Sequence, residues 1–412
     1  MEPLDRREFM RVMLAGGLAL GLGPGADEQR PPDLDAMRRL LAGHRIARIE
    51  SKRSSDRYSH FVGRGATGGS TRFGFGREIR ILVSDQGVSG GAMSGAGPDE
   101  VSRLTGTRVS DLFDLRTGTS DEAMSIDLPL HDLAGNILGM PVYKLLGASG
   151  PTHVPIYSSS IHFEDLEPWG QAEGIPRLLA ACRTDYDLGY RAFKLKIGRG
   201  FQWMPREEGQ RRDVAVTRAV RERFPDCRII VDANNGYAVD DFLHYVSAVA
   251  DSDLYCIEEP FEENREDLLR LRDHMRKVGC RARIMEGESR SEAAPEPWRY
   301  GHYSRAHVDR LFALAEEGLV DTFNMDLAIV GYTRWRRVMP ELVRAGVSAS
   351  PHTWAGTPRP YYCAHLAAGV GNVDMVEGIP GKASGMDYSA YTFKDGRLVV
   401  PDLPGFGISL SL

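Results

Sequence analysis

From Val154 onward, the chain alternates short apolar runs with longer stretches whose apolar residues recur every three or four positions. The runs have the length and the β-branched content of buried strands, and there are eight of them: VPIYSSS, AFKLKIG, RIIVDANN, LYCIEEP, RIMEGES, DTFNMDLA, VSASPHTW and VDMVEG. The stretches between them have the period of amphipathic helices, as in residues 266–278, where one face carries Leu268, Leu271, Met275 and Val278. Alternating strands and helices favour a parallel sheet, and eight such units predict a (β/α) barrel over residues 151–400.

Residues 45–150 have a different pattern, with strand-like stretches such as IRILVSDQGV and a helical stretch over residues 124–146. This mixture predicts a smaller α+β domain. Residues 63–76 hold too many glycines for regular structure, and we expect a flexible loop there that acts as a lid.

The first 26 residues predict a targeting segment rather than part of the fold. Arg6 and Arg7 precede an apolar run over residues 12–23, which is shorter than the roughly 20 residues that a membrane-spanning helix needs. The string DRREFMR resembles a bacterial twin-arginine export signal, which predicts a periplasmic or exported protein without a stable membrane anchor. The alternative is a cytoplasmic protein with a disordered tail that contains the arginine pair by chance.

Composition and charge narrow the class of function. Of the 412 residues, 42% are hydrophobic and 26% are charged, a globular balance that argues against a disordered or membrane-embedded chain. The formal net charge of -6 gives no electrostatic reason to bind nucleic acid, so a small anionic substrate would need a local site. The five scattered cysteines contain no CxxC pair and predict neither a disulfide framework nor a thiolate metal site.

Charged residues end nearly every predicted strand. In a barrel the carboxyl ends of the strands form the active site, so a series of charges at these positions indicates catalysis rather than solvation. In chain order the positions are Lys194 and Lys196, Asp232, Glu258 with Glu259, Glu288, Asp326, His352 and Glu377.

Three of these carboxylates follow successive strands, so we expect Asp232, Glu258 and Glu288 on one side of the barrel mouth, where the strand ends meet. Unpaired they would repel one another, and burying them without a cation would be costly. Oxygen ligands without His or Cys favour Mg²⁺, with Mn²⁺ as the other candidate. The alternative is a set of salt bridges to nearby Lys or Arg. Glu286 rivals Glu288, because side chains two positions apart on a strand share a face.

Two groups suited to proton transfer lie at the same strand ends. Lys194 and Lys196 project to one face of their strand, where two ammonium groups lower each other's proton affinity and favour a lysine base. His352 ends the seventh strand and Asp326 the sixth, an arrangement in which a carboxylate orients an imidazole. The sequence therefore predicts a lysine and a histidine on opposite strands of the barrel.

The strand ends match the pattern of a known family: Lys-x-Lys, Asp232-Ala-Asn234, Ile-Glu258-Glu259-Pro260, Gly-Glu288, Asp326, His352 and Glu377. This set resembles the enolase superfamily, specifically its mandelate racemase subgroup. The resemblance covers about residues 45–405 and includes the stretch HDLAGNILGMPVYKLLG. It implies an α/β fold, a modified TIM barrel (β/α)7β with an N-terminal α+β capping domain to which the C-terminal segment returns. It also implies Mg²⁺-assisted removal of the proton next to a substrate carboxylate, and a homo-oligomer.

The resemblance also implies a role for each matched residue. The metal ligands would be Asp232, Glu258 and Glu288, and the Gly-Glu match favours Glu288 over Glu286. The proton-transfer groups would be Lys196 and the His352–Asp326 pair. The substrate-binding residues would be Lys194 at the carboxylate, Asn234, a protonated Glu377 at the enediolate, and Arg64 and His60 in the capping loop over residues 54–77.

The lysine and His-Asp combination leaves two reactions open. One is dehydration of an acid sugar to a 2-keto-3-deoxy acid, in which His352 expels the 3-hydroxyl, and the other is racemisation or epimerisation of a 2-hydroxy acid. The muconate lactonizing and dipeptide epimerase branch carries a lysine where this chain has Asp326. A non-catalytic exported protein that binds acid sugars is the remaining alternative.

We favour dehydration, because dehydratases are numerous in the family and because the loops after Lys196 and Glu288 are polar. Residues in these loops that could bind a polyol are Arg199, Trp203, Arg290, Trp298, Arg299 and Tyr300.

Overall fold

The computed structural model describes residues 33–68, 73–166, 174–288, 304–354 and 356–411. Internal contacts divide the chain into residues 1–37 and residues 38–412, and the second unit contains all the sheets. The predicted export segment, residues 1–26, lies outside the described residues.

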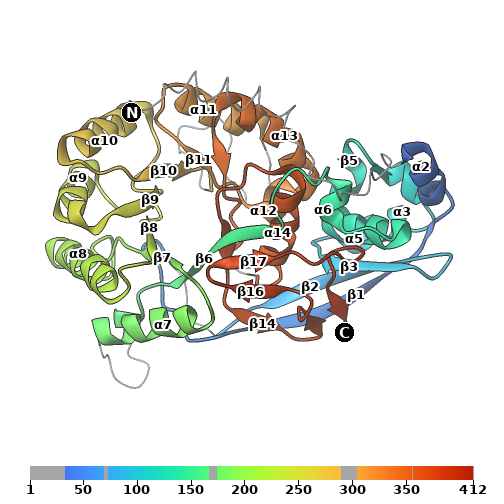
Figure 1. The fold of residues 1–412 in the computed structure, drawn as a ribbon, viewed down its shortest axis with the longest axis horizontal. Coiled ribbons are helices and arrows are strands. Elements are labelled where there is room, and N and C mark those ends of the chain that lie inside the picture. The colour runs from blue at the N-terminus through green and yellow to red at the C-terminus, as the bar shows by residue number, and fades with distance from the viewer. Residues whose placement is uncertain (1–32, 69–72, 167–173, 289–303, 355, 412) are drawn as a thin grey trace, which may run out of the picture. The chain divides into compact units, whose positions relative to one another are not determined.

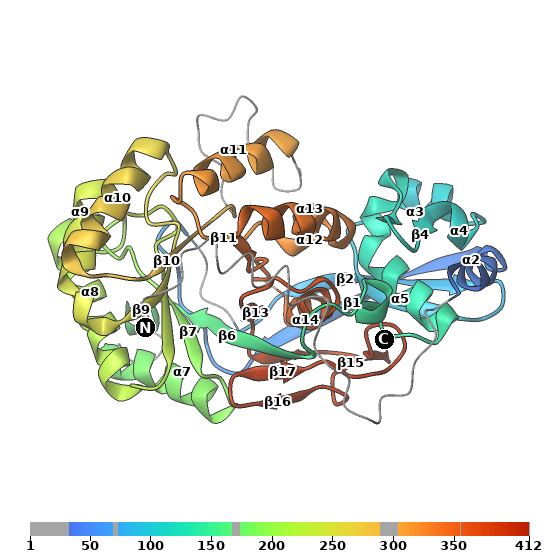
Figure 2. The ribbon, with the colours of Figure 1, turned by 45° about the horizontal axis from the view of Figure 1, so that its top comes forward.

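Within the described residues, eight parallel strands close into a barrel (Figure 1, Figure 2). Neighbouring strands follow the order β12-β11-β10-β9-β8-β7-β6, β13 pairs with β6, and a bridge from Ala349 to Val373 closes the ring. The strands are β6 (His153–Ile161), β7 (Ala192–Lys196), β8 (Arg228–Asp232), β9 (Leu254–Glu258), β10 (Arg283–Glu286), β11 (Thr322–Phe323), β12 (Ser348–Ala349) and β13 (Val376–Gly378). The predicted barrel is confirmed, although β11 and β12 are only two residues long.

Side chains of the strands alternate between the barrel interior and the layer beneath the helices. The inner cluster consists of Tyr157, Ala192, Ile230, Cys256, Met285 and Met375. Their strand neighbours Phe193, Ile257 and Ile284 belong to the larger core between strands and helices. Because this period is two residues, Lys194 and Lys196 follow Ala192 on the inner face.

Helices connect consecutive strands and cover the barrel from outside, as α7 to α10 do in Figure 1. They are α7 (Ile175–Asp187), α8 (Arg206–Arg223), α9 (Val239–Ala248), α10 (Arg265–Val278), α11 (Arg305–Glu316), α12 (Leu327–Val330), α13 (Tyr332–Ala345) and α14 (Arg359–Val370), with the 3-10 turns η2 (Glu164–Leu166) and η3 (Ala250–Ser252). The helix predicted over residues 266–278 is α10. Its N-cap Asn264 accepts a hydrogen bond from the backbone N–H of Asp267, and its buried face carries Leu268, Leu271 and Met275.

An α+β cap precedes the barrel, built on an antiparallel sheet in the order β14-β1-β2-β3. Its elements are α2 (Leu34–Ala42), β1 (Ile46–Tyr58), β2 (Gly76–Ser84), β3 (Ser89–Met93), α3 (Pro98–Leu104), α4 (Val109–Leu112), β4 (Phe113–Asp114), β5 (Gly118–Thr119), η1 (Asp121–Ile126), α5 (Asp127–Leu138) and α6 (Val142–Leu145). The helical stretch predicted over residues 124–146 is divided among η1, α5 and α6. The break follows from Gly139, which has φ +63, and from Pro141 just before α6.

The C-terminal segment returns to the cap. Its strands are β14 (Gly381–Ala383), β15 (Met386–Asp387), β16 (Thr392–Lys394), β17 (Arg397–Val399) and β18 (Ser409–Leu410), and β14 pairs with the end of β1, beside which it lies in Figure 1. Asp132 on α5 accepts from the backbone N–H of Phe406 at 2.6 Å and of Gly91 at 2.8 Å. One buried carboxyl group thus joins the C-terminal segment, α5 and β3.

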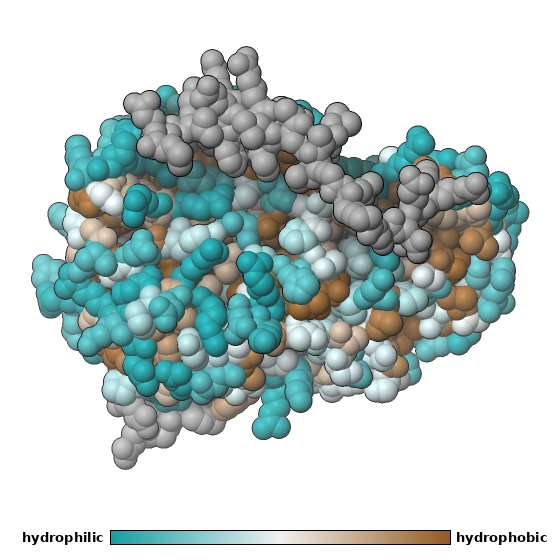
Figure 3. All heavy atoms as spheres, in the orientation of Figure 1, coloured by the Kyte–Doolittle hydropathy of each residue, from teal (hydrophilic) through white to brown (hydrophobic). Residues whose placement is uncertain are grey.

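No helix in the described ranges combines the length and the apolar character that crossing a bilayer requires. On the face drawn in Figure 3, hydrophilic residues cover most of the surface and hydrophobic residues form separate areas.

Candidate active site

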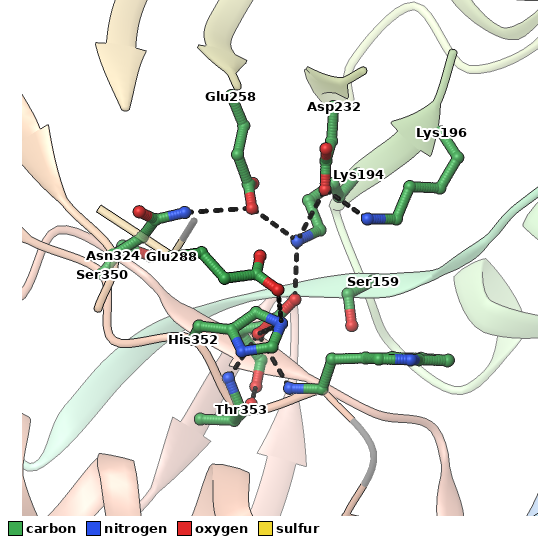
Figure 4. A network of polar contacts seen from close by, with 12 residues as sticks. Ser159, Lys194, Lys196, Asp232, Glu258, Glu288, Asn324, Ser350, His352 and Thr353 are labelled. Atoms are coloured by element: carbon green, nitrogen blue, oxygen red, sulfur yellow. Dashed lines mark hydrogen bonds and ion pairs between the residues drawn. The ribbon is translucent and has the colours of Figure 1, made fainter. Parts of the chain in front are cut away.

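The charged residues at the strand ends meet at the barrel mouth, with Lys194 of β7 at the centre of their network (Figure 4). Its Nζ lies 2.7 Å from Glu377 Oε1, 2.9 Å from Glu258 Oε1 and 3.2 Å from Asp232 Oδ2. Burial works to lower the pKa of Lys194, but Glu258 and Glu377 outweigh it and raise the pKa well above its usual value. Lys194 is therefore an ammonium group that compensates three buried carboxylates.

Lys196, the next residue on the same face of β7, is paired with Asp232. Its Nζ donates to Asp232 Oδ2 at 2.5 Å, and Asp232 Oδ1 accepts from the backbone N–H of Asn234 at 2.9 Å. Burial works to raise the pKa of Asp232, but Lys196 and Lys194 outweigh it and lower the pKa. The side chain of Asn234 donates to Glu259 Oε2 at 3.5 Å, so its predicted substrate contact stays a prediction.

Glu258, at the end of β9, has one satisfied and one unsatisfied carboxylate oxygen. Its Oε1 accepts from Lys194 and from Asn324 Nδ2 at 3.1 Å, whereas Oε2 is buried without a hydrogen-bond partner. Burial and the negative charge of Asp232 raise the pKa of Glu258 well above its usual value. Sequence reasoning missed Asn324, although its place directly after β11 is the same signal that identified the other strand-end residues.

Glu377 lies on β13, opposite the segment that follows β12. Its Oε2 accepts hydrogen bonds from the backbone N–H groups of Thr353 and Trp354. Burial works to raise the pKa of Glu377, but Lys194 and His352 outweigh it and lower the pKa to about 2. The structure thus holds Glu377 as a carboxylate. This differs from the protonated acid expected from the sequence, because the Lys194 ammonium lies 2.7 Å away.

His352 and Asp326 form the predicted imidazole–carboxylate pair. His352 Nδ1 donates to Asp326 Oδ2 at 2.9 Å, and the same oxygen accepts from Arg359 Nη1 at 3.0 Å. On the other side of the ring, His352 Nε2 lies 3.2 Å from Glu288 Oε1. Burial works to lower the pKa of His352, but Glu288, Glu377 and Asp326 outweigh it and raise the pKa to about 9. No sequence signal marked Arg359, which lies at the start of α14 and not at a strand end.

Gly287 separates the two rival glutamates of the fifth strand. Its φ is +125, a backbone conformation that glycine adopts readily and other residues adopt rarely. Gly287 directly follows the end of β10 at Glu286. Burial and the nearby carboxylate of Glu263 raise the pKa of Glu286 well above its usual value. After the turn at Gly287, Glu288 reaches His352 at the barrel mouth.

Carboxylate oxygens without a partner indicate where a metal ion would bind. Glu258 Oε2 and Glu288 Oε2 are both buried without a hydrogen-bond partner. With Asp232 they offer only oxygen donors, the type that Mg²⁺ prefers. In the described part of the chain these carboxylates do not form a ready-made metal cluster, because Lys194 bridges two of them and Glu288 contacts His352. The three carboxylates therefore fit Mg²⁺ once Asp232 and Glu258 release Lys194 and Glu288 releases His352.

The two predicted cap-loop residues are engaged within the protein. His60 Nδ1 lies 2.8 Å from the carbonyl oxygen of Phe61, and its Nε2 lies 3.2 Å from Asp185 Oδ1 on α7. The guanidinium group of Arg64 stacks on the Trp203 ring at 4.3 Å. These contacts attach the cap loop to the barrel, and a substrate contact by either residue stays a prediction.

The expectation that Arg199 serves a polar substrate loop is wrong. Its guanidinium group is fully buried and lies 2.6 Å from both Asp165 and Asp213, which makes it part of the barrel's internal structure. The other predicted loop, residues 289–303, lies outside the described residues, and with it Arg290, Trp298, Arg299 and Tyr300.

Comparison with known proteins agrees with the fold. Residues 177–295 and 301–411, more than half of the chain, match the family described as "Enolase C-terminal domain-like". The chain belongs to this family. The resemblance to the enolase superfamily is thereby confirmed. D-galactarolactone cycloisomerase of Agrobacterium fabrum is 26% identical to this enolase-family chain over 268 residues, which are 64% of the chain and 62% of that relative. The chain thus matches less than two thirds of that relative's length.

Two solved structures share the fold over most of this chain. A galacturonate dehydratase from a Geobacillus species, complexed with D-galacturonate and 5-keto-4-deoxy-D-galacturonate, has a TM-score of 0.80 and 28% identity, covering 90% of this chain and 95% of that one. A mandelate racemase/muconate lactonizing protein from Geobacillus sp. Y412MC10, complexed with magnesium and tartrate, has the same TM-score of 0.80 and 28% identity, covering 90% and 94%. Other curated relatives are named as a dehydratase and as dipeptide epimerases. The named relatives are therefore enzymes, as the sequence predicted for this chain.

Proposed function

We propose that this enolase-family chain is a Mg²⁺-dependent acid-sugar dehydratase that forms a 2-keto-3-deoxy acid. The observation that carries the proposal is the pair of proton-transfer groups at one barrel mouth. Lys196 ends β7, and His352, oriented by Asp326, follows β12. These strands are not neighbours in the barrel, so a substrate between the two groups would meet a base on one side and an acid on the other. The galacturonate dehydratase with the same fold supports a sugar-acid substrate.

Asp232, Glu258 and Glu288 are the residues that would hold Mg²⁺. When bound, the ion supplies positive charge that stabilises the negative charge developing on the substrate carboxylate. Lys194 supplies a second fixed charge, because its buried ammonium lies within 3.2 Å of three carboxylates. In this role Lys194 would bind the substrate carboxylate.

Lys196 would remove the proton from the carbon next to the carboxylate. In the structure its Nζ donates to Asp232 Oδ2, so the lysine acts as a base only after it gives up this hydrogen bond and one proton. The electron pair of the broken C–H bond would form the enediolate. As this collapses, His352 would donate its Nε2 proton to the 3-hydroxyl, which leaves as water, and the resulting enol becomes the 2-keto acid.

A screen of acid sugars with and without Mg²⁺ tests the proposal, with formation of a 2-keto acid as the readout. We expect at least one acid sugar to be dehydrated, the activity to disappear with a chelator, and added Mg²⁺ to restore it. His352→Asn, purified in the same way, controls for contaminating dehydratases. The proposal fails if no acid sugar yields a 2-keto acid, or if His352→Asn yields as much as the wild type.

The same pair of groups favours one other reaction, in which His352 and Lys196 exchange a proton with opposite faces of a 2-hydroxy acid. Curated relatives that are named as epimerases support this second candidate. In heavy water a racemase or epimerase would incorporate deuterium at the 2-carbon with inversion and without a 2-keto product. Binding of an acid sugar without either outcome would favour a non-catalytic binding protein.

A further inference from the structure

Arg359, at the start of α14, contacts the His352–Asp326 pair but has no part in the proposed chemistry. Its Nη1 donates to Asp326 Oδ2 at 3.0 Å and to the carbonyl oxygen of Trp354 at 2.9 Å. The side chains of Arg359 and Asp326 are 14% and 5% exposed. The contact therefore lies in the protein interior, where a hydrogen bond between charged groups is stronger than at the surface.

Asp326 accepts four hydrogen bonds, two at each oxygen. Its Oδ1 accepts from the backbone N–H groups of Ala328 at 2.7 Å and Ile329 at 3.0 Å, at the start of α12. Its Oδ2 accepts from His352 Nδ1 and from Arg359 Nη1. Oδ2 must orient the imidazole of His352. Arg359 is the other partner of Oδ2 and fixes this oxygen independently of the imidazole.

The cap holds the loop that leads into Arg359. Thr357 Oγ1 donates to Asp56 Oδ1 at 2.9 Å, and Arg77 Nε donates to Asp56 Oδ2 at 2.9 Å. Asp56 lies on β1 and Arg77 on β2. The two arginines flank Gly356, where a Cβ atom would lie 3.0 Å from Arg359 Cγ and 3.2 Å from Arg77 Nε. A continuous chain of contacts thus leads from the cap sheet to the acid/base pair.

We propose that Arg359 is a positioning residue for the His352–Asp326 pair, and that Asp56 of the cap holds Arg359 in place. The part of His352 in catalysis rests on the proposed function, whereas the contacts do not. With Arg359 in place, Asp326 Oδ2 stays directed at Nδ1, the ring keeps one orientation, and Nε2 faces the barrel mouth. Docking of the cap then becomes a condition for acid/base chemistry in the barrel.

The first measurement observes the imidazole directly and needs no substrate. In protein labelled with ¹⁵N-histidine, the ring signals of His352 are identified by their loss in His352→Asn. Arg359→Ala is expected to shift or broaden the His352 Nδ1 signal, and Asp56→Asn is expected to do so to a smaller extent. Arg265→Ala removes only an exposed ion pair and serves as the matched control, with the His352 signal unchanged.

The second measurement separates positioning from folding. For an acid sugar that the enzyme dehydrates, Arg359→Ala should lower kcat about 10²-fold, while exchange of the 2-proton, assigned to Lys196, falls far less. Free guanidinium at low concentration should restore part of the lost kcat of Arg359→Ala. It should not raise the kcat of Arg265→Ala. Arg359→Lys should retain more activity than Arg359→Ala, because it keeps the charge. A variant that had merely lost its fold would not be rescued by a denaturant.

The outcomes distinguish this inference from the proposed function. An unchanged His352 signal in Arg359→Ala would overturn the positioning role, whatever reaction the enzyme catalyses. A changed signal in a protein that dehydrates no acid sugar would refute the proposed function and leave the positioning role intact. If Arg359→Ala does not fold, Arg359→Lys and Asp56→Asn carry the same test, and unchanged signals in both would overturn the inference.

Discussion

At the scale of single residues, the charge balance of the site depends on Lys194. Its ammonium is shared by Asp232, Glu258 and Glu377, which would otherwise repel one another in the barrel interior. Binding of Mg²⁺ would add positive charge at two of these carboxylates, Asp232 and Glu258, and at Glu288. It would stabilise the folded state, because the unfolded chain does not assemble the three ligands.

Asp232→Asn removes the carboxylate that contacts both lysines of β7. We expect this variant to lose the rise in unfolding free energy that Mg²⁺ gives the wild type, about 2.7 kcal/mol when Mg²⁺ exceeds its Kd a hundred-fold. Urea unfolding with and without Mg²⁺ measures the difference. Glu286→Gln is the matched control and should keep the Mg²⁺ effect. An undiminished effect in Asp232→Asn would contradict the ligand assignment.

At the scale of elements, the barrel strands and α10 could be predicted because a buried strand and an amphipathic helix impose fixed periods on the sequence. The strand-end residues could be predicted because every barrel strand brings its end to the same mouth. The contacts of Arg359 and Asn324 could not be predicted, because they depend on partners that only the folded chain brings near. The charge state of Glu377 also depends on such a partner, the ammonium of Lys194.

Gly287 tests how one turn positions a side chain at the barrel mouth. In Gly287→Ala, φ +125 becomes strained, and the new Cβ atom lies 3.0 Å from Leu311 Cδ1. We expect a loss of about 1–3 kcal/mol in unfolding free energy and a weaker Mg²⁺ effect, because Glu288 is displaced. The matched control is Gly279→Ala, at a position of φ +75 with open space around it, which should keep the Mg²⁺ effect. Equal Mg²⁺ effects in both variants would show that the turn does not position Glu288.

At the scale of the whole molecule, several contacts join the cap to the barrel. β14, which follows the last barrel strand in the sequence, pairs with β1 of the cap sheet. Asp56 of β1 accepts a hydrogen bond from Thr357, and His60 pairs with Asp185 on α7. Burial works to lower the pKa of His60, but the Asp185 carboxylate outweighs it and raises the pKa to about 9. The His60–Asp185 pair should therefore make docking of the cap loop depend on pH.

The sign of this dependence follows from the raised pKa. Because the folded protein binds the His60 proton more tightly than the unfolded chain, the pair stabilises the fold fully below about pH 6.5, and this contribution is lost as the pH rises through about 9. We expect His60→Gln to lower the unfolding free energy by about 1–3 kcal/mol at pH 6 and by much less at pH 9.5. Urea unfolding across this pH range measures the difference in unfolding free energy between the wild type and the variant. His153→Gln, at an exposed position, is the matched control and should show a small difference. A difference in unfolding free energy for His60→Gln that does not change with pH would contradict the ion pair.

The central claim is that Lys196 removes the 2-proton and His352 acts from the other side as the acid. The most direct measurement follows, for one acid sugar in heavy water, both the exchange of the 2-proton and the formation of the 2-keto acid. His352→Asn should stop dehydration and leave exchange, whereas Lys196→Ala should reduce both, by about 10²–10⁴-fold. Full dehydration by Lys196→Ala, together with loss of exchange in His352→Asn, would contradict the account and reverse the two roles.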